Sequence, residues 1–154
     1  MELNIRENGK LEFNDCRIIF RNFSGVGSKF NREGDKNFAI VIPDTDCADM
    51  LANAGWNVKM KPALDEGDMP RMNLPVKVKF NDHGPNVYLQ TGATRIKLTE
   101  ENVGMLDKLD VERIDCDIRP YDWEVNGNKG RSAYLDAMLF VQRCDRFAAD
   151  MSVQ

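Results

Sequence analysis

The residues of this 154-residue chain that are best suited to engage a ligand are aromatic and basic side chains in its last third. Tyr121 and Trp123 stand two positions apart, so an extended strand places both rings on one face, beside Arg119. Tyr134 follows a glycine-rich, basic turn at 126–131. Proteins use rings beside cations to stack on unpaired bases and to hold phosphates. Rings also fill the core of an ordinary β-barrel, and for these three rings both interpretations are open.

Other basic and aromatic residues extend this set along the chain. The cations expected to attract phosphates are Arg21, Lys29, Arg32, Lys77, Lys79, Arg95, Lys97, Arg119, Lys129 and Arg131. The rings expected to contact bases are Phe23, Phe30, Tyr121, Trp123 and Tyr134. Four further aromatic residues are expected in the core, namely Phe38, Trp56, Phe80 and Phe140. Because every base has a π-face, such a set predicts binding with little sequence preference.

The net charge of −4 argues mildly against a nucleic-acid partner, but the charged residues are unevenly distributed. Residues 17–36 contain five basic and two acidic residues, and residues 71–97 contain five basic and one acidic. Residues 100–124 contain nine acidic and three basic residues. We expect the two basic segments to meet on one face, with an acidic helix at 100–113 elsewhere. The alternative is that both kinds of segment mix on solvated faces.

Candidates for catalysis are few. Asp115 and Asp117 share a strand face, and paired carboxylates can bind a metal or transfer protons. Alternation on a solvent-exposed face explains the same spacing and is the favoured interpretation. The four cysteines are widely separated, which indicates reduced thiols, with a zinc site assembled from distant cysteines as the alternative. We therefore predict no catalytic residues, no cofactor and no metal.

Hydrophobic alternation predicts a series of strands with two short helices between them. The expected strands span residues 16–23, 37–42, 56–61, 74–80, 87–90 and 94–98, followed by a long hairpin over 114–142. The expected helices span 47–53 and about 99–109. This order is typical of a β-rich fold, all-β to α+β, built as a Greek-key barrel with helical insertions. The length fits a single domain over 1–154, with its core at about 16–143 and short flexible termini.

Several runs of this sequence resemble a known family. They are FRNFSGVGSKFNREGDKNFAIVIPD, AGWNVK, VKVKF and IRPYDWEVNGNKGRSAYLDAM, and they fall within residues 16–143. They look like a group of phage and prophage proteins of Gram-positive bacteria that are described as single-stranded-DNA-binding-like, with an oligonucleotide-binding (OB) barrel. The resemblance implies an OB-like Greek-key barrel that binds single-stranded DNA in phage DNA replication or recombination.

Two other functions stay open. One is a phage protein-interaction module that engages a host factor through the barrel or its acidic segment, and the other is a metal-dependent nuclease. Expected partners are single-stranded DNA and, as candidates, phage or host replication and recombination proteins; a homo-oligomer is left open. No apolar run approaches 18 residues, and the N-terminus lacks a signal-peptide pattern. No membrane partner and a cytoplasmic location in a bacterial host are therefore expected.

The end of the chain differs from that of cellular single-stranded-DNA-binding proteins. Those proteins end in an acidic tail with a proline–phenylalanine tip that recruits partners. The present sequence ends DRFAADMSVQ and has no such tip. Recruitment of the host replisome through a tip of this kind is therefore not expected.

Overall fold

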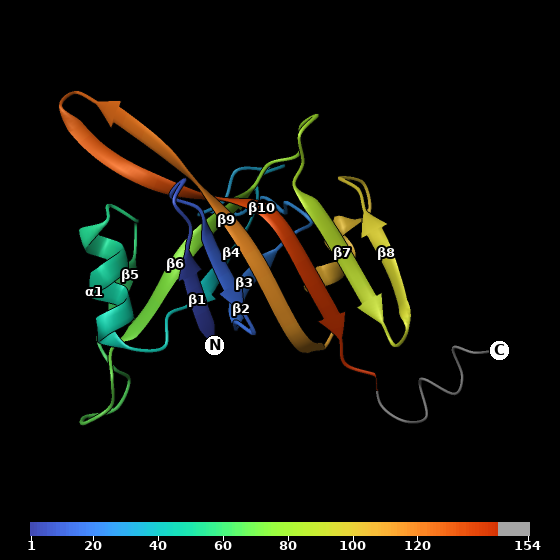
Figure 1. Cartoon of the computed structure of the whole chain (residues 1–154), viewed down its shortest axis with the longest axis horizontal. Helices are drawn as coiled ribbons and strands as arrows, with labels where there is room; N and C mark the ends of the chain where they lie inside the picture. The colour runs from blue at the N-terminus through green and yellow to red at the C-terminus, as the bar shows by residue number, and fades with distance from the viewer. Residues whose placement is uncertain (145–154) are drawn as a thin grey trace.

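Strand β10 (Asn128–Gln142) pairs with three other strands in the computed structural model, which describes residues 1–144. It runs antiparallel to β9 (Val111–Val125). Its other edge pairs in parallel first with β6 (Arg71–Val78) and then with β7 (Asn86–Thr91). A register shift in the hairpin between Leu135 and Ala137 separates the two parallel pairings. One strand thereby joins both halves of a ten-stranded sheet (Figure 1).

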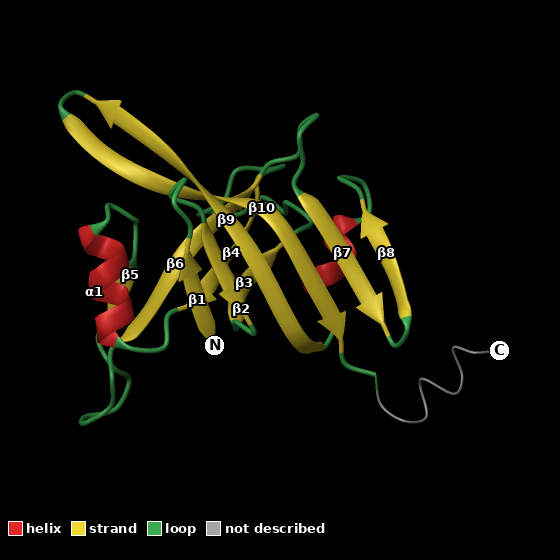
Figure 2. Ribbon diagram, in the orientation of Figure 1, coloured by secondary structure: helices red, strands yellow, loops and turns green. Residues whose placement is uncertain are grey.

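The remaining strands extend the sheet on both sides of this centre. Beyond β9 lie β2 (Leu11–Asn14) and β1 (Glu2–Ile5). Beyond β6 lie β4 (Lys36–Val41) and β3 (Ile18–Asn22). The short strand β5 (Lys59–Lys61) pairs with β6, and β8 (Thr94–Leu98) pairs with β7. The described chain is thus strand-rich with two short helices between strands, as the sequence predicts (Figure 2).

The first helix forms where the sequence predicts it. Helix α1 (Thr45–Asn53) starts after Asp44, whose carboxylate accepts a hydrogen bond of 2.8 Å from the Cys47 N–H and so caps the first turn. It ends at Asn53, and Gly55, which follows the C-cap Ala54, has a φ of +94° that is favourable for glycine. The helix buries Leu51 against the barrel.

The second helix is shorter than expected. Instead of a helix to about residue 109, the segment forms a single 3₁₀ helix, η1 (Val103–Asp107). Two interactions with other parts of the chain account for this. The Arg21 guanidinium donates hydrogen bonds to the carbonyl oxygens of Leu106 and Leu109. The Asp107 carboxylate accepts a hydrogen bond from the Phe23 N–H. The two carbonyl oxygens thus have Arg21 as a partner in place of the N–H groups of a further helical turn, and the Asp107 contact ties the segment to the end of β3.

The N-terminal residues form part of the barrel, so the expectation of a short flexible N-terminus is wrong. Strand β2 pairs with β9 through Leu11, Glu12 and Phe13, and β1 pairs along the outer edge of β2. Leu11 and Phe13 are fully buried in the core. Apolar and polar residues alternate over 11–14, but four residues are too few for this pattern to have predicted a strand. The expected flexible C-terminus, including the missing tip, falls on 145–154, which lie outside the described residues.

The core contains the aromatic residues that were expected there. Phe38, Trp56 and Phe140 are buried, and Phe80 is partly buried against the same cluster. All four cysteines are free thiols, as their spacing indicates. The Sγ atoms of Cys16 and Cys116 lie 3.9 Å apart inside the core, where burial raises the pKa of the Cys116 thiol.

The N-terminal correction predicts a large effect of Phe13→Ala on stability. Removing a fully buried phenylalanine ring should lower the free energy of unfolding by about 3–5 kcal/mol, measured by urea denaturation. Asn4→Ala, on the exposed side of β1, is the control and should change it by less than about 0.5 kcal/mol. Equal, small effects of both substitutions would mean that the N-terminal hairpin is peripheral to the fold.

Candidate nucleic-acid interface

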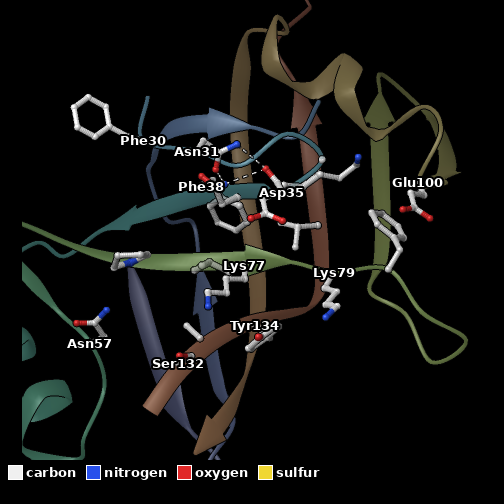
Figure 3. Close-up of a pocket in the computed structure, with 18 residues that line it drawn as sticks. Phe30, Asn31, Asp35, Phe38, Asn57, Lys77, Lys79, Glu100, Ser132 and Tyr134 are labelled. Carbon is white, nitrogen blue, oxygen red and sulfur yellow. Dashed lines mark hydrogen bonds between the residues drawn. The ribbon is translucent and has the colours of Figure 1, made fainter. Parts of the chain in front are cut away.

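A groove of about 620 Å³ lies on the outward face of β4, β6 and β10 (Figure 3). Lys77 of β6, Lys79 just after it and Tyr134 of β10 line it. Strand residues alternate between two faces, and both Val78, between the two lysines, and Ala133, next to Tyr134, are buried in the core. The barrel core thus fixes which side chains point into the groove.

Tyr134 lies on the floor of the groove between two cations. The β10–β6 register places it directly beside Lys77, whose Nζ is 5.8 Å from the centre of the ring. The β10–β9 register places it beside Arg119, whose guanidinium carbon is 5.0 Å from the same centre. Figure 3 shows Lys77 and Tyr134 next to each other. Such a ring offers a surface for stacking, with cations placed to meet phosphates.

The outward row of rings continues along β9, beyond the groove. Tyr121 contacts Tyr134 edge to face, with ring centres 5.6 Å apart, and it is 53% exposed. Trp123 is 38% exposed and lies against Gly130 on the neighbouring strand, where a side chain would leave no room for the indole ring. The sequence left core and ligand contact open for these rings. Their exposure indicates a surface role.

Another exposed ring belongs to the loop between β3 and β4. Phe30 is 91% exposed and lies with Lys29, whose Nζ is 5.7 Å from the ring centre. The loop is held by Asn31, whose side-chain amide donates to the carbonyl oxygens of Val26 and Asp35 at 2.9 and 3.0 Å. Asn37 of β4 donates to Asn31 at 2.8 Å and ties the loop to the sheet. Phe30 is therefore presented at the rim of the groove, which it lines, by an ordered turn.

The charge of the groove is mixed. Its lining includes three lysines, Lys36, Lys77 and Lys79, and two acids, Asp35 and Glu100. Parts of the two basic segments meet here, as expected. The expectation that the acidic 100–113 segment lies elsewhere is wrong for Glu100, its first residue, which lines the groove. The reason is that the chain leaving β8 passes the end of the groove before η1 begins.

Two residues of the sequence-based set do not belong to this surface. Phe23 is fully buried and stacks on Phe38 in the core with ring centres 5.3 Å apart, so its expected role in base stacking is wrong. The guanidinium of Arg21 donates to the backbone of the η1 region, and its expected role as a free phosphate ligand is corrected to a structural one. A register shift in the β3–β4 pairing between Ile19 and Asn22 interrupts the strict alternation of side chains along β3. The expected positions of Arg21 and Phe23 assumed that this alternation was unbroken.

Five further cations of the sequence-based set do not line the groove. Arg131 and Lys129 point to the opposite face of the β9–β10 hairpin from Trp123, because they alternate with its cross-strand partner Gly130. Arg131 forms an ion pair with Asp122 at 2.7 Å. Arg95 and Lys97 lie on β8, which pairs with β7 and not with β6. Arg32 lies in the same loop as Phe30, without lining the groove.

Sequence reasoning missed several polar residues of the groove. Lys36, Asn57 and Ser132 line it, and Asn31 and Asn37 position its rim. Ser132 was detectable, since it alternates with Tyr134 on one strand. Asn57 was not, because only the tertiary fold brings the segment after α1 to the edge of β6.

The alternative catalytic site finds little support in the geometry. Asp115 accepts hydrogen bonds from Arg113 at 3.0 Å and from the backbone N–H of Asp15 at 2.8 Å. Asp117 has a pKa raised by partial burial and by the nearby Glu12. Within residues 1–144 there is no group of three or more side chains that could hold a metal ion. No helix in that range is long and apolar enough to cross a membrane.

Comparison with known proteins gives one family and several related folds. The model of the family described as "Putative phage ssDNA-binding domain" matches residues 2–151. The single-stranded DNA-binding protein from bacteriophage Enc34 in complex with ssDNA is similar in structure, with a TM-score of 0.59 and 13% identity, over 94% of this chain and 93% of that one. The same phage protein in a second structure gives a TM-score of 0.55 and 13% identity, over 96% and 93%. None of the curated proteins matches. At this identity the likeness shows a shared fold, which confirms the OB-like class.

The contact between Trp123 and Gly130 predicts a local effect of Gly130→Ala. The added methyl group should push the indole away from β10, because a Cβ there would overlap the ring. In a Trp56→Phe background, which leaves Trp123 as the reporter, emission should move to longer wavelength. Ser132→Ala, on the same face two residues along, is the control and should leave emission unchanged. An unchanged spectrum for Gly130→Ala would show that the indole does not rest on this glycine.

Proposed function

The chain belongs to the family of phage ssDNA-binding domains, and from this premise we propose that it binds single-stranded DNA across the groove of β4, β6 and β10 and the aromatic face of the hairpin. The observation that supports this most is the outward row of Lys77, Tyr134 and Tyr121, continued by Trp123. An exposed row of rings beside cations is the arrangement that proteins use to stack unpaired bases and hold the phosphates of a single strand. The shared fold with a phage protein that is known in complex with ssDNA is in keeping with it.

The binding mode follows from the groups available. Rings of Tyr134, Tyr121, Trp123 and Phe30 stack on bases, and Lys77, Lys79, Lys36, Arg119 and Lys29 attract phosphates. Stacking accepts every base, so sequence preference is low. The protein acts in phage DNA replication or recombination, in the cytoplasm of a bacterial host, as a single domain. We assign it no chemistry of its own, because Asp115, one of the two candidate carboxylates, is bound to Arg113 and to the backbone N–H of Asp15.

The main competing function is a protein-interaction module that uses the acidic segment 100–124. The described contacts weigh against it. Asp107 is bound to the Phe23 and Ser24 backbone, and Asp122 to Arg131, so these acids already have partners inside the chain. Replication or recombination proteins of phage or host are partners in addition to DNA, not in its place.

Phosphate neutralisation predicts that affinity for oligo-dT depends on salt. For single strands the slope of log K against log salt is about −0.7 per phosphate neutralised, so three to five engaged cations give roughly −2 to −3.5. Lys77→Gln should make the slope less steep by about 0.7. Lys61→Gln, on the exposed β5 outside the groove, is the control and should not change it. A wild-type slope near zero would remove phosphate contacts from the mechanism.

The two tryptophans provide a matched test of stacking against core packing. Trp123→Ala should lower affinity for oligo-dT by about 1–3 kcal/mol, the usual contribution of one stacked base, with little change in Tm. Trp56→Ala should lower the free energy of unfolding by about 3–5 kcal/mol, because Trp56 is 4% exposed. Titration by fluorescence anisotropy and thermal unfolding measure the two quantities. A large loss of stability for Trp123→Ala with affinity intact would make Trp123 a core residue.

A further inference from the structure

The outer part of the β9–β10 hairpin projects from the barrel as an arm, residues 119–132 (Figure 1). Strand β2 pairs with β9 only up to Ile118, and β6 pairs with β10 only at Ala133 and Tyr134. Within the described chain, the arm has a single further backbone pairing, an isolated bridge between Arg131 and Trp56. A two-stranded ribbon without other support is marginally stable and flexible. The orientation of the arm relative to the barrel therefore depends on the contacts between Arg131 and Trp56.

Three side chains meet at this point. The guanidinium of Arg131 lies over the ring of Trp56, with its central carbon 5.5 Å from the ring centre. The Asp122 carboxylate accepts from Arg131 Nε at 2.7 Å and from Nη2 at 3.3 Å, a two-pronged pair across the hairpin. This pair lowers the pKa of the Asp122 carboxyl through the hydrogen bonds and the charge of Arg131. The planar guanidinium thus stacks on Trp56 and forms a bidentate pair with Asp122. A lysine cannot reproduce this geometry.

The platform below Arg131 is rigid. Trp56 is almost fully buried, and its backbone N–H donates to the carbonyl oxygen of Leu51 at 3.0 Å, at the end of α1. Beyond its own two strands, the arm is therefore joined to a buried part of the barrel by the Arg131–Trp56 backbone bridge and by the stacked guanidinium. Arg131 lies on the face of the arm opposite to Tyr121 and Trp123, because residues of a strand alternate. Arg131 can therefore fix the position of the Tyr121 and Trp123 rings without contacting the DNA that these rings bind.

We infer that Arg131 is a positioning residue, which holds the arm so that Tyr121 and Trp123 continue the row of rings begun by Tyr134. This inference rests on the proposed binding of single-stranded DNA. It assigns to Arg131 a role different from that of the phosphate-binding cations. Its guanidinium is occupied by Asp122 and Trp56, and its removal loosens the arm without removing a phosphate contact.

Asp122→Asn distinguishes the two roles most sharply. If Arg131 is a positioning residue, the weakened contact between the substituted side chain and Arg131 loosens the arm. Kd for oligo-dT then rises about three- to tenfold, with the loss of one stacked base as the upper limit. The slope of log K against log salt stays unchanged, because no phosphate contact is lost. If Arg131 binds phosphate, the same substitution frees it, so Kd falls and the slope steepens. Glu124→Gln is the control, since Glu124 shares the face of Asp122 on β9 and forms no ion pair with Arg131. It should leave Kd within about twofold of wild type, a change too small to indicate a lost contact.

Arg131→Lys keeps the positive charge and removes the bidentate pair with Asp122. It should reproduce the rise in Kd, with the slope of log K against log salt unchanged. In a Trp123→Ala background, either substitution at the pair should cost less than in wild type, because part of its effect passes through the Trp123 ring. Hydrogen exchange of the amides at 119–132 should accelerate in both variants. Full additivity with Trp123→Ala, or unchanged exchange, would overturn the inference. Failure of wild-type protein to bind oligo-dT would instead overturn the proposed function, which separates the two.

Discussion

The hydrogen bonding of β10 to three strands is the constraint on which the rest of the structure depends. Its first part pairs with β6 and its last part with β7, both in parallel, while β9 covers its other edge. The register shift between Leu135 and Ala137 lets one strand serve two partners on the same edge, since an extra residue bends a strand and increases its twist. Without this pairing Tyr134 would not lie beside Lys77, and the groove would lose its floor.

The alternation of side chains then decides which residues are available to a ligand. Ala133 and Leu135 of β10 and Ile118 of β9 are buried in the barrel. The residues between them must face outward, so Tyr134, Arg119 and Tyr121 form a row on the surface. Beyond the end of the barrel, the inward face has no core to fill. There the chain places Arg131, stacked on Trp56 and paired with Asp122.

Local patterns predicted much of the fold and part of the site. The long hairpin, the cap of α1 and the alternating strand of Lys77 and Lys79 depend on interactions between near neighbours, which the sequence displays. Phe23 and Arg21 could not be placed in this way, since their surroundings come from Phe38 and from the η1 segment. The position of Glu100 in the groove and the contribution of Asn57 likewise depend on how distant segments pack. The pairing of Arg131 with Asp122 needs the hairpin register, which the two-residue turn Asn126–Gly127 sets with φ of +51° and +83°. The sequence-based expectation placed the turn broadly over 126–131 and so did not fix this register.

The central claim is that single-stranded DNA lies on the outward row of rings, and photo-crosslinking of the full chain to an oligo-dT that carries 5-iodouracil tests it most directly. Iodouracil couples on irradiation to an aromatic ring on which it stacks, and mass spectrometry of the digest identifies the ring. The account predicts crosslinks to Tyr134, Trp123, Tyr121 and Phe30. Crosslinks confined to Tyr88 of β7, a ring outside the groove lining, would place the DNA on another part of the sheet and contradict the account.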